Sequence, residues 1–301
     1  MKKLILFFVI GLLLSACQPV DFQEKPPVFD TGVDPNAWAL IPAGEFLQGQ
    51  FNKEVVIDKD YEMMVTPVTV AQYAAYLNEA LAAGTVRIED DQVVGHYEGE
   101  PFQAGRHEEE FPAGDYLHIP LTNAFLRLDY DGAQFTAKEG WENHPMTLVS
   151  WFGAAGYCEY YNWRLPSELE WEKAARGTDG RAFPWGNELA RNNANFYFSR
   201  DPFENMKTFG SRTTPVGFYN GKVYDGYQTL DSASPYGLYD MAGNVWQWTG
   251  DDYDSQHYRY ARGGSKDVYE LNLRVWARNN ATPTFTSPGI GFRCARDSGQ
   301  E

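Results

Sequence analysis

The chain has 301 residues, with 25 Lys and Arg against 41 Asp and Glu, which gives a formal net charge of −16. A hydrophobic share of 43% and an aromatic share of 16% supply enough apolar material for a core, which excludes a wholly disordered chain. The excess of acidic residues argues against a nucleic-acid binder and against electrostatic binding to anionic lipid, because both need a basic surface. It permits a cationic partner or a calcium ion, although an acidic surface also serves solubility alone.

The first sixteen residues have the pattern of a secretory signal peptide. Two lysines precede an apolar run from Leu4 to Leu14, which is too short to cross a bilayer. The run ends in residues 14–17 (LSAC), which resemble the lipobox of bacterial lipoproteins. We therefore expect cleavage before Cys17, acylation of Cys17 and anchoring to the bilayer of a bacterial cell envelope. Gln18 after the cysteine resembles an outer-membrane sorting signal if the host is Gram-negative. The alternative to the lipobox is an ordinary signal peptide with a chance cysteine.

Residues 17–36 predict a flexible tether between the lipid and a folded domain that covers residues 37–301. The segment contains four prolines and shows no hydrophobic periodicity. With Cys17 assigned to lipidation, Cys158 and Cys294 are the two cysteines that are left. In an exported protein one disulfide between them is the default expectation, with two unrelated buried thiols as the alternative.

The first elements of the domain are a strand and a helix. Apolar and polar residues alternate from Trp38 to Phe46, which predicts a strand that enters a turn. Apolar residues then recur at helical spacing from Val70 to about Leu81, with Thr69 as the N-cap and Gly84 at the end.

Residues 85–140 contain no motif and predict an elaborated loop and hairpin region. A second amphipathic helix is predicted from Trp151 to Trp163. A third begins after Ser167, with Glu170 at the capping-box position, and ends at Gly177. Short strands and long loops follow, so the fold class is α+β with three helices and many short strands.

Nine phrases of the sequence resemble, in order, the formylglycine-generating enzyme family, whose members are also called sulfatase-modifying factors. The resemblance covers about residues 37–297 and implies a single domain with a C-type-lectin-like fold, with Cys158–Cys294 as a structural disulfide. The phrases are residues 40–46 (LIPAGEF), 67–69 (PVT) with 72–73 (QY), 144–145 (HP) with 149–151 (VSW), 164–177 (RLPSELEWEKAARG), 183–187 (FPWGN), 214–217 (TPVG), 236–248 (YGLYDMAGNVWQW), 262–265 (RGGS) and 291–294 (GFRC).

The resemblance also implies a copper centre, which this sequence does not complete. The family enzymes hold copper(I) with two cysteines after the Gly-Gly-Ser turn and use oxygen to convert a substrate cysteine to formylglycine. The matching residues 265–274 (SKDVYELNLR) contain no Cys, His or Met, and Glu270 stands at the place of the second cysteine. Soft copper(I) selects thiolate ligands, so we expect no copper. Ser265 and Trp246 do match active-site positions, whereas Gly289 stands where the family has an Asn.

Two other enzyme classes find little support. Sulfoxide synthases with a related domain use three histidines on an additional helical domain, which this chain lacks, and its five histidines show no i,i+4 pairing. A Ser-His-Asp hydrolase would need a nucleophile-elbow motif, and none is present.

Calcium is the metal that the resemblance retains. One family site implies side chains of Asp240 and Gln247 with the carbonyls of Gly243 and Val245. Because Glu is usual where Gln247 stands, one charge is lost and affinity should fall. Asn195 and Phe196 match part of a second site. The alternative for Asp240 is a turn residue that bonds its own backbone.

Two functions remain. The first is a non-catalytic binding or scaffold lipoprotein of the cell envelope, with an envelope protein or a glycan as its partner. The second is a formylglycine-generating-type oxidoreductase with a divergent active site. A mixed aromatic and polar face would serve recognition, although it could also be ordinary solvated surface. That face comprises Lys266, Asp267, Tyr269, Glu270, Asn272, Arg274, Trp276 and Arg278.

Overall fold

The computed structural model describes residues 24–99, 111–205, 210–252 and 258–299. A four-stranded sheet lies at the centre of the molecule, in the strand order β16-β15-β14-β17. β14 pairs with β17 in parallel, and the other two pairings are antiparallel. These strands are β14 (Trp246–Asp252), β15 (Arg259–Arg262), β16 (Arg278–Ala281) and β17 (Ile290–Phe292).

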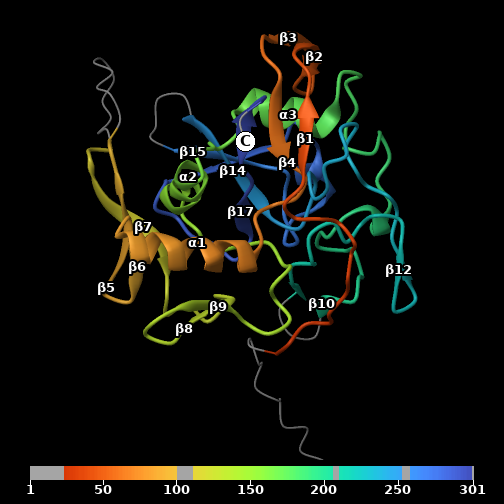
Figure 1. The fold of residues 1–301 in the computed structure, drawn as a ribbon. Helices are drawn as coiled ribbons and strands as arrows, with labels where there is room; N and C mark the ends of the chain where they lie inside the picture. The colour runs from red at the N-terminus through yellow and green to blue at the C-terminus, as the bar shows by residue number, and fades with distance from the viewer. Residues whose placement is uncertain (1–23, 100–110, 206–209, 253–257, 300–301) are drawn as a thin grey trace, which may run out of the picture.

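A second sheet joins the two ends of the domain. β4 (Tyr61–Met64) lies between β1 (Trp38–Ile41) near the start of the chain and β18 (Ala295–Asp297) near its end, and both pairings are antiparallel (Figure 1). Because the first and last strands share one partner, the domain closes on itself.

The three predicted helices are confirmed, and local capping explains their starts. α1 (Val70–Ala83) begins with a capping box of Thr69 and Gln72 and ends at Gly84 with φ 75°. α3 (Glu168–Arg176) begins with the capping box of Ser167 and Glu170. α2 (Trp151–Tyr160) is shorter than predicted. The chain leaves this helix before Trp163 because Asn162 takes a left-handed conformation with φ 61°.

The predicted strand from Trp38 to Phe46 is two strands. β1 stops at Ile41, and β2 (Gly44–Gln48) pairs with β3 (Lys53–Ile57) in a hairpin that projects at the top of Figure 1. The ammonium of Lys173 on α3 donates to the carbonyl oxygens of Pro42 at 2.6 Å and Gly44 at 2.9 Å. A tertiary contact therefore fixes the bend that the alternating pattern did not reveal.

Hairpins occur in the described part of residues 85–140, which is residues 85–99 and 111–140. One sheet has the order β5-β6-β7, and β8 pairs with β9. The strands are β5 (Val86–Glu89), β6 (Gln92–Tyr97), β7 (Gly114–Pro120), β8 (Leu128–Tyr130) and β9 (Phe135–Ala137). The remaining short elements are η1 (Arg191–Asn193), β10 (Glu204–Asn205), β11 (Gly210–Ser211), β12 (Val223–Tyr224), β13 (Tyr227–Gln228) and η2 (Glu270–Leu273).

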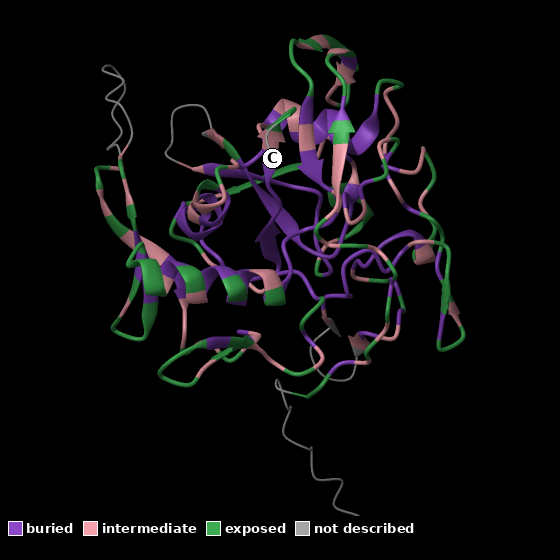
Figure 2. Ribbon diagram, in the orientation of Figure 1, coloured by how far each residue is buried: buried purple, intermediate pink, exposed green. Residues whose placement is uncertain are grey.

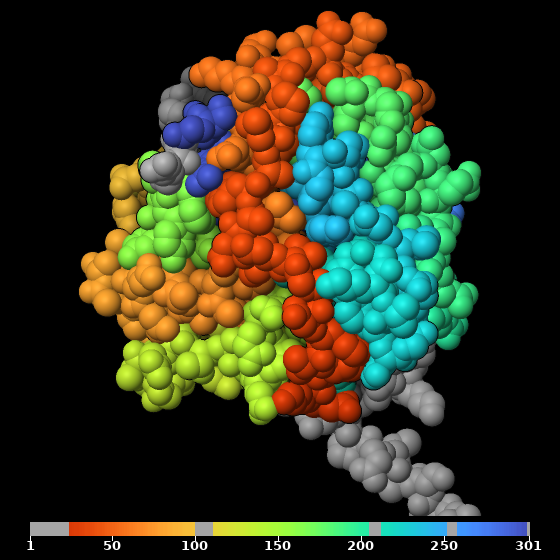
Figure 3. Space-filling view, turned by 45° about the vertical axis from the view of Figure 1, so that its right-hand side comes forward, coloured from red at the N-terminus to blue at the C-terminus, as the bar shows by residue number. Residues whose placement is uncertain are grey.

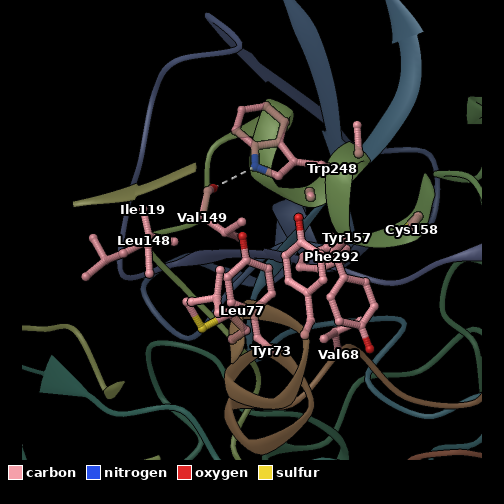
Figure 4. Packing of buried hydrophobic residues seen from close by; sticks show 14 of the residues in the cluster. Val68, Tyr73, Leu77, Ile119, Leu148, Val149, Tyr157, Cys158, Trp248 and Phe292 are labelled. Carbon is pink, nitrogen blue, oxygen red and sulfur yellow. Dashed lines mark hydrogen bonds between the residues drawn. The ribbon is translucent and has the colours of Figure 1, made fainter. Parts of the chain in front are cut away.

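The main core lies between α1, α2 and the central sheet, where the ribbon is mostly buried (Figure 2). Rings of Tyr73, Tyr157 and Phe292 meet there, with centroids 5.7 Å apart for Tyr73–Tyr157 and 5.3 Å for Tyr157–Phe292 (Figure 4). The disulfide between Cys158 and Cys294 is present beside them, which confirms the predicted pairing. It ties α2 to the segment that links β17 to β18.

The expected tether over residues 17–36 requires a correction from Glu24 onward; residues 17–23 lie outside the described part. The ring of Phe29 packs against Phe203, Phe218 and Tyr224 at centroid distances of 5.3–5.9 Å. Thr31 donates to the Val216 carbonyl at 3.0 Å. Figure 3 shows this red segment as a band across the surface beside the cyan residues. Apolar burial of one aromatic residue thus holds a proline-rich segment that has no periodicity of its own.

No helix within the described ranges has the length and apolar character needed to span a membrane.

Candidate functional site

The loop that follows β15 enters the centre of the domain through two glycines. Gly263 and Gly264 have φ of 96° and 74°, which favour glycine. A Cβ on Gly264 would lie 2.7 Å from the Asn272 carbonyl oxygen. The Gly-Gly turn therefore lets residues 265–273 fold back against their own start.

Ser265, Trp246 and Gly289 come together at this loop. The backbone N–H of Trp246 donates to the Gly289 carbonyl at 2.8 Å. A Cβ on Gly289 would lie 3.5 Å from the Ser265 hydroxyl oxygen and 3.3 Å from a carboxylate oxygen of Asp267. Ser265 and Trp246 are both buried. The family positions are therefore assembled, although Gly289 brings no side chain to them.

An ion pair stands near these positions. The Lys266 ammonium contacts the Asp267 carboxylate, and the Lys266 side chain is only 10% exposed. The Lys266 N–H also donates to the Asn244 carbonyl at 3.0 Å. This donor set consists of oxygen and nitrogen with no sulfur. Because Cys158 and Cys294 are joined and Cys17 lies outside the described residues, the residues present here do not fit copper(I).

The first predicted calcium cluster is held by protein donors. The Gln247 side-chain oxygen accepts from Arg293 Nε at 2.7 Å and from Trp171 Nε1 at 3.1 Å. The Gln247 amide nitrogen donates to the Asp240 carbonyl at 2.7 Å. The Asp240 carboxylate accepts from the Gly217 N–H at 2.7 Å. In this arrangement Gln247 has no free oxygen lone pair for a cation, so the cluster as it stands does not fit calcium.

Electrostatics at this cluster follow from burial. Burial raises the pKa of Asp240, and it lowers the pKa of the Arg293 guanidinium to about 9 against the opposing effect of Asp240. The two other predicted ligands are carbonyls at buried positions, and the Gly243 N–H donates to the Gly263 carbonyl at 2.8 Å. Val245 is fully buried. Calcium here stays a prediction that requires Gln247 to release its donors.

At the second predicted calcium site, the carbonyls of Asn195 and Phe196 already accept hydrogen bonds from the protein, and the nearby Asp201 carboxylate points into the domain. The Asn195 carbonyl accepts from the Asn244 N–H at 2.8 Å, and the Phe196 carbonyl accepts from the Ser199 N–H at 3.0 Å. The carboxylate of Asp201 accepts from Ser199 at 2.8 Å and from Tyr219 at 2.7 Å. No group of three or more His, Cys, Asp or Glu suited to a metal occurs in the described segments.

The predicted recognition face is smaller than the sequence indicated. Its exposed members are Asp267, Tyr269, Glu270 and Asn272 in one run of chain, together with Arg278. The prediction that Lys266 belongs to this face is wrong, because its side chain is buried and paired with Asp267.

Three members of the face, including the exposed Arg278, are engaged within the domain. The guanidinium of Arg274 lies 5.8 Å from the ring centroid of Trp276, and both residues are half-buried. Arg278 pairs with the buried Glu168 at 2.8 Å.

Sequence reasoning missed two features around the site. A buried ionic network joins Arg262 to Glu168 at 2.8 Å and to Glu172 at 2.7 Å, and Glu172 also pairs with Arg176 at 2.8 Å. The i,i+4 spacing of Glu172 and Arg176 was a signal for the last pair alone. The second feature is an aromatic contact between residues 197–198 and Tyr269, which are far apart in the sequence.

The architecture is that of known solved proteins. PvdO from Pseudomonas aeruginosa matches with a TM-score of 0.57 at 21% identity, over 91% of this chain and 99% of that chain. CarF matches with a TM-score of 0.55 at 21% identity, over 87% and 98%. These likenesses support the α+β, C-type-lectin-like fold expected from the sequence.

The chain belongs to the sulfatase-modifying factor family, since the model of the sulfatase-modifying factor enzyme 1-like domain matches residues 27–298. The formylglycine-generating enzyme of Streptomyces coelicolor is 36% identical over 183 residues, which are 53% of this chain and 54% of that protein. The mouse formylglycine-generating enzyme is 32% identical over 213 residues, 60% of this chain and 54% of that protein.

A third relative, from Bos taurus, bears the name inactive C-alpha-formylglycine-generating enzyme 2. It is 35% identical over 193 residues, 60% of this chain and 59% of that protein. The chain thus spans somewhat more than half the length of these relatives. The family therefore includes proteins named as active and as inactive.

Proposed function

We propose that this chain is a non-catalytic binding or scaffold protein, anchored to the bacterial cell envelope through acylated Cys17. The observation that supports a non-catalytic role is the loop at residues 265–273. It contains the Lys266–Asp267 ion pair and the buried side chains of Ser265 and Leu273, but no thiol. Copper(I) chemistry needs sulfur ligands. The family scaffold is otherwise retained, including the Gly-Gly turn and the disulfide.

The partner class fits the exposed part of this loop. Tyr269 and Asn272 offer an aromatic ring and an amide, which are common in recognition surfaces for proteins and glycans. Calcium at the Asn195 and Asp240 positions stays a prediction within this proposal, because the Gln247 side-chain oxygen would first have to turn away from Arg293 and Trp171. The lipobox and the signal pattern support the location.

The alternative function is a formylglycine-generating-type oxidoreductase. The assembly of Ser265, Trp246 and Gly289 favours it, as do the relatives named as active enzymes. Because no thiol stands at the loop, this reading requires another arrangement of ligands.

An aldehyde assay separates the two functions. The full chain is incubated with a sulfatase-type cysteine peptide, copper and oxygen, and the peptide mass is followed. We expect no loss of mass, because nothing at the loop holds copper(I). The Streptomyces coelicolor relative serves as the positive control. Aldehyde formation that disappears in Ser265→Ala would overturn the non-catalytic proposal.

A further inference from the structure

Three aromatic side chains from two distant segments form a patch at the surface. The ring centroid of Tyr269 lies 5.1 Å from that of Tyr197 and 5.7 Å from that of Phe198, and the last two are 4.7 Å apart. Tyr269 is 56% exposed and Phe198 is 40% exposed. We call these three residues the aromatic patch. Leu271, which is 60% exposed, follows on the same loop as Tyr269.

Both segments that carry the aromatic patch are anchored in the domain. Phe196 and Leu273 are buried together in one hydrophobic cluster. The Tyr197 N–H donates to the Val268 carbonyl at 3.1 Å, which links the two segments directly. A surface that is fixed before binding loses little conformational entropy when a partner docks. The patch is thus preorganised, unlike a single exposed ring on a loose loop.

The charges next to the patch leave one carboxylate uncompensated. Asp267 is paired with Lys266. On the other segment, the backbone N–H of Arg200 donates to the carboxylate of Glu204, and the positive charge of Arg200 acts on that carboxylate. Glu270 follows Tyr269, is exposed, and makes no ion pair with any residue that the structure places. The chain as a whole carries a charge of −16.

We propose that the aromatic patch is the docking point for a protein partner that presents an apolar or aromatic side chain flanked by Lys or Arg. Interface centres are rich in aromatic residues and depleted in charge, as this patch is. The uncompensated Glu270 and the negative charge of the chain complement a basic flank on the partner. The unpaired charge of Glu270 favours a cationic group, which Lys and Arg side chains supply and neutral sugars do not, and this favours a protein over a glycan. This inference rests on the proposed binding function and adds the place and the partner chemistry.

The test pans a displayed library of random peptides on the full chain and measures the affinity of the selected peptides. We expect selected peptides to share an aromatic or aliphatic residue next to Lys or Arg. Their Kd should rise at least about tenfold in Tyr269→Ala and, separately, in Phe198→Ala, because each removes a ring of the patch. Phe51→Ala is the matched control: Phe51 is 91% exposed on the β2–β3 hairpin, has no part in the patch, and should leave the Kd unchanged.

Other outcomes overturn the inference in distinguishable ways. Selected peptides that bind both patch variants within twofold, but lose binding in Asn272→Ala, would refute the patch and leave the binding function standing. Failure to select any peptide would refute the protein partner, as would an oligosaccharide whose binding Tyr269→Ala abolishes. A dimer of the chain that Phe198→Ala dissociates would assign the patch to a second copy. Aldehyde formation by the wild-type chain would instead overturn the proposed function itself.

Discussion

At the scale of single residues, two buried histidines are held neutral by their surroundings. His118 lies among three glycines, and a Cβ on Gly95 would stand 2.5 Å from its ring. Burial lowers the pKa of His118 to about 4. His144 donates to or accepts from Thr213 at 2.9 Å, and burial together with the charge of Arg127 lowers the pKa of His144 to about 3. Both therefore remain uncharged in the folded chain at neutral pH.

This arrangement predicts a loss of stability in mild acid. In the unfolded chain a histidine has a pKa of about 6.5. Below that pH the unfolded state binds a proton, whereas folded His118 stays unprotonated until about pH 4. The free energy of unfolding should fall by about 2 kcal/mol per histidine between pH 7 and pH 5, and the loss should be complete below pH 4 for His118. Denaturant unfolding at the two pH values measures it.

The variant His118→Gln isolates this contribution. It should be less stable at pH 7 but lose about 2 kcal/mol less than the wild type on going to pH 5. Equal losses in both proteins would contradict the assignment. Ring NMR of the wild type gives an independent check, because the His118 signal should not titrate above pH 5.

At the scale of elements, the segment from Glu24 to Asn36 is part of the domain. Its proline-rich pattern indicated a tether, yet Phe29 completes an aromatic cluster with Phe203, Phe218 and Tyr224. Asn220 and Lys222 both donate to the Thr31 carbonyl, at 2.9 Å and 2.7 Å. A segment with so few apolar residues is held by one ring and by bonds to its backbone.

Replacement of that ring should therefore destabilise the whole domain. Phe29→Ala should lower the free energy of unfolding by about 2 kcal/mol, because a half-buried aromatic side chain loses its packing. Val28→Ala is the matched control, since Val28 is 64% exposed and next to Phe29 in the chain. Equal effects of the two substitutions in thermal or denaturant unfolding would show that the segment does not contribute through its ring.

At the scale of the whole molecule, the docked segment limits how far a lipid anchor could hold the domain from a bilayer. Glu24 already contacts the domain through an ion pair with Arg212 at 2.6 Å. Seven residue steps separate Glu24 from Cys17 (24 − 17), which span at most about 25 Å when fully extended. An acylated Cys17 would therefore keep the face that carries Glu24 close to the membrane, while the negative charge of the chain provides no attraction to anionic headgroups.

Anchoring depends on one cysteine, so one substitution tests it. Cys17→Ala should move the expressed protein from the detergent-extracted membrane fraction to the soluble fraction, because an acyl chain supplies the affinity for the bilayer. The mass added by acylation should disappear from the protein at the same time. Val20→Ala is a control that leaves the cysteine intact. An unchanged distribution between the fractions would refute the lipid anchor.

Local signals in the sequence were sufficient for the helices and the disulfide. Thr69 with Gln72 and Ser167 with Glu170 are capping pairs three residues apart, so neighbouring residues alone determine where α1 and α3 begin. With Cys17 assigned to lipidation, a disulfide between Cys158 and Cys294 was the default expectation, and the structure contains it. The ordered phrases indicated the family, and with it the fold.

Contacts between distant segments were decided by the tertiary structure. The meeting of Tyr269 with Tyr197 and the burial of Lys266 depend on how two loops fold against each other, and no periodic pattern encodes such a contact. The hydrogen bond between Gln247 and Arg293 could not be predicted from the sequence for the same reason, because the two residues are far apart in the chain. The fold class and the lack of sulfur ligands at residues 265–274 could be predicted from the sequence, because both follow from residue identity. The three-dimensional arrangement alone decided which side chains face solvent, because burial is a property of the packed chain.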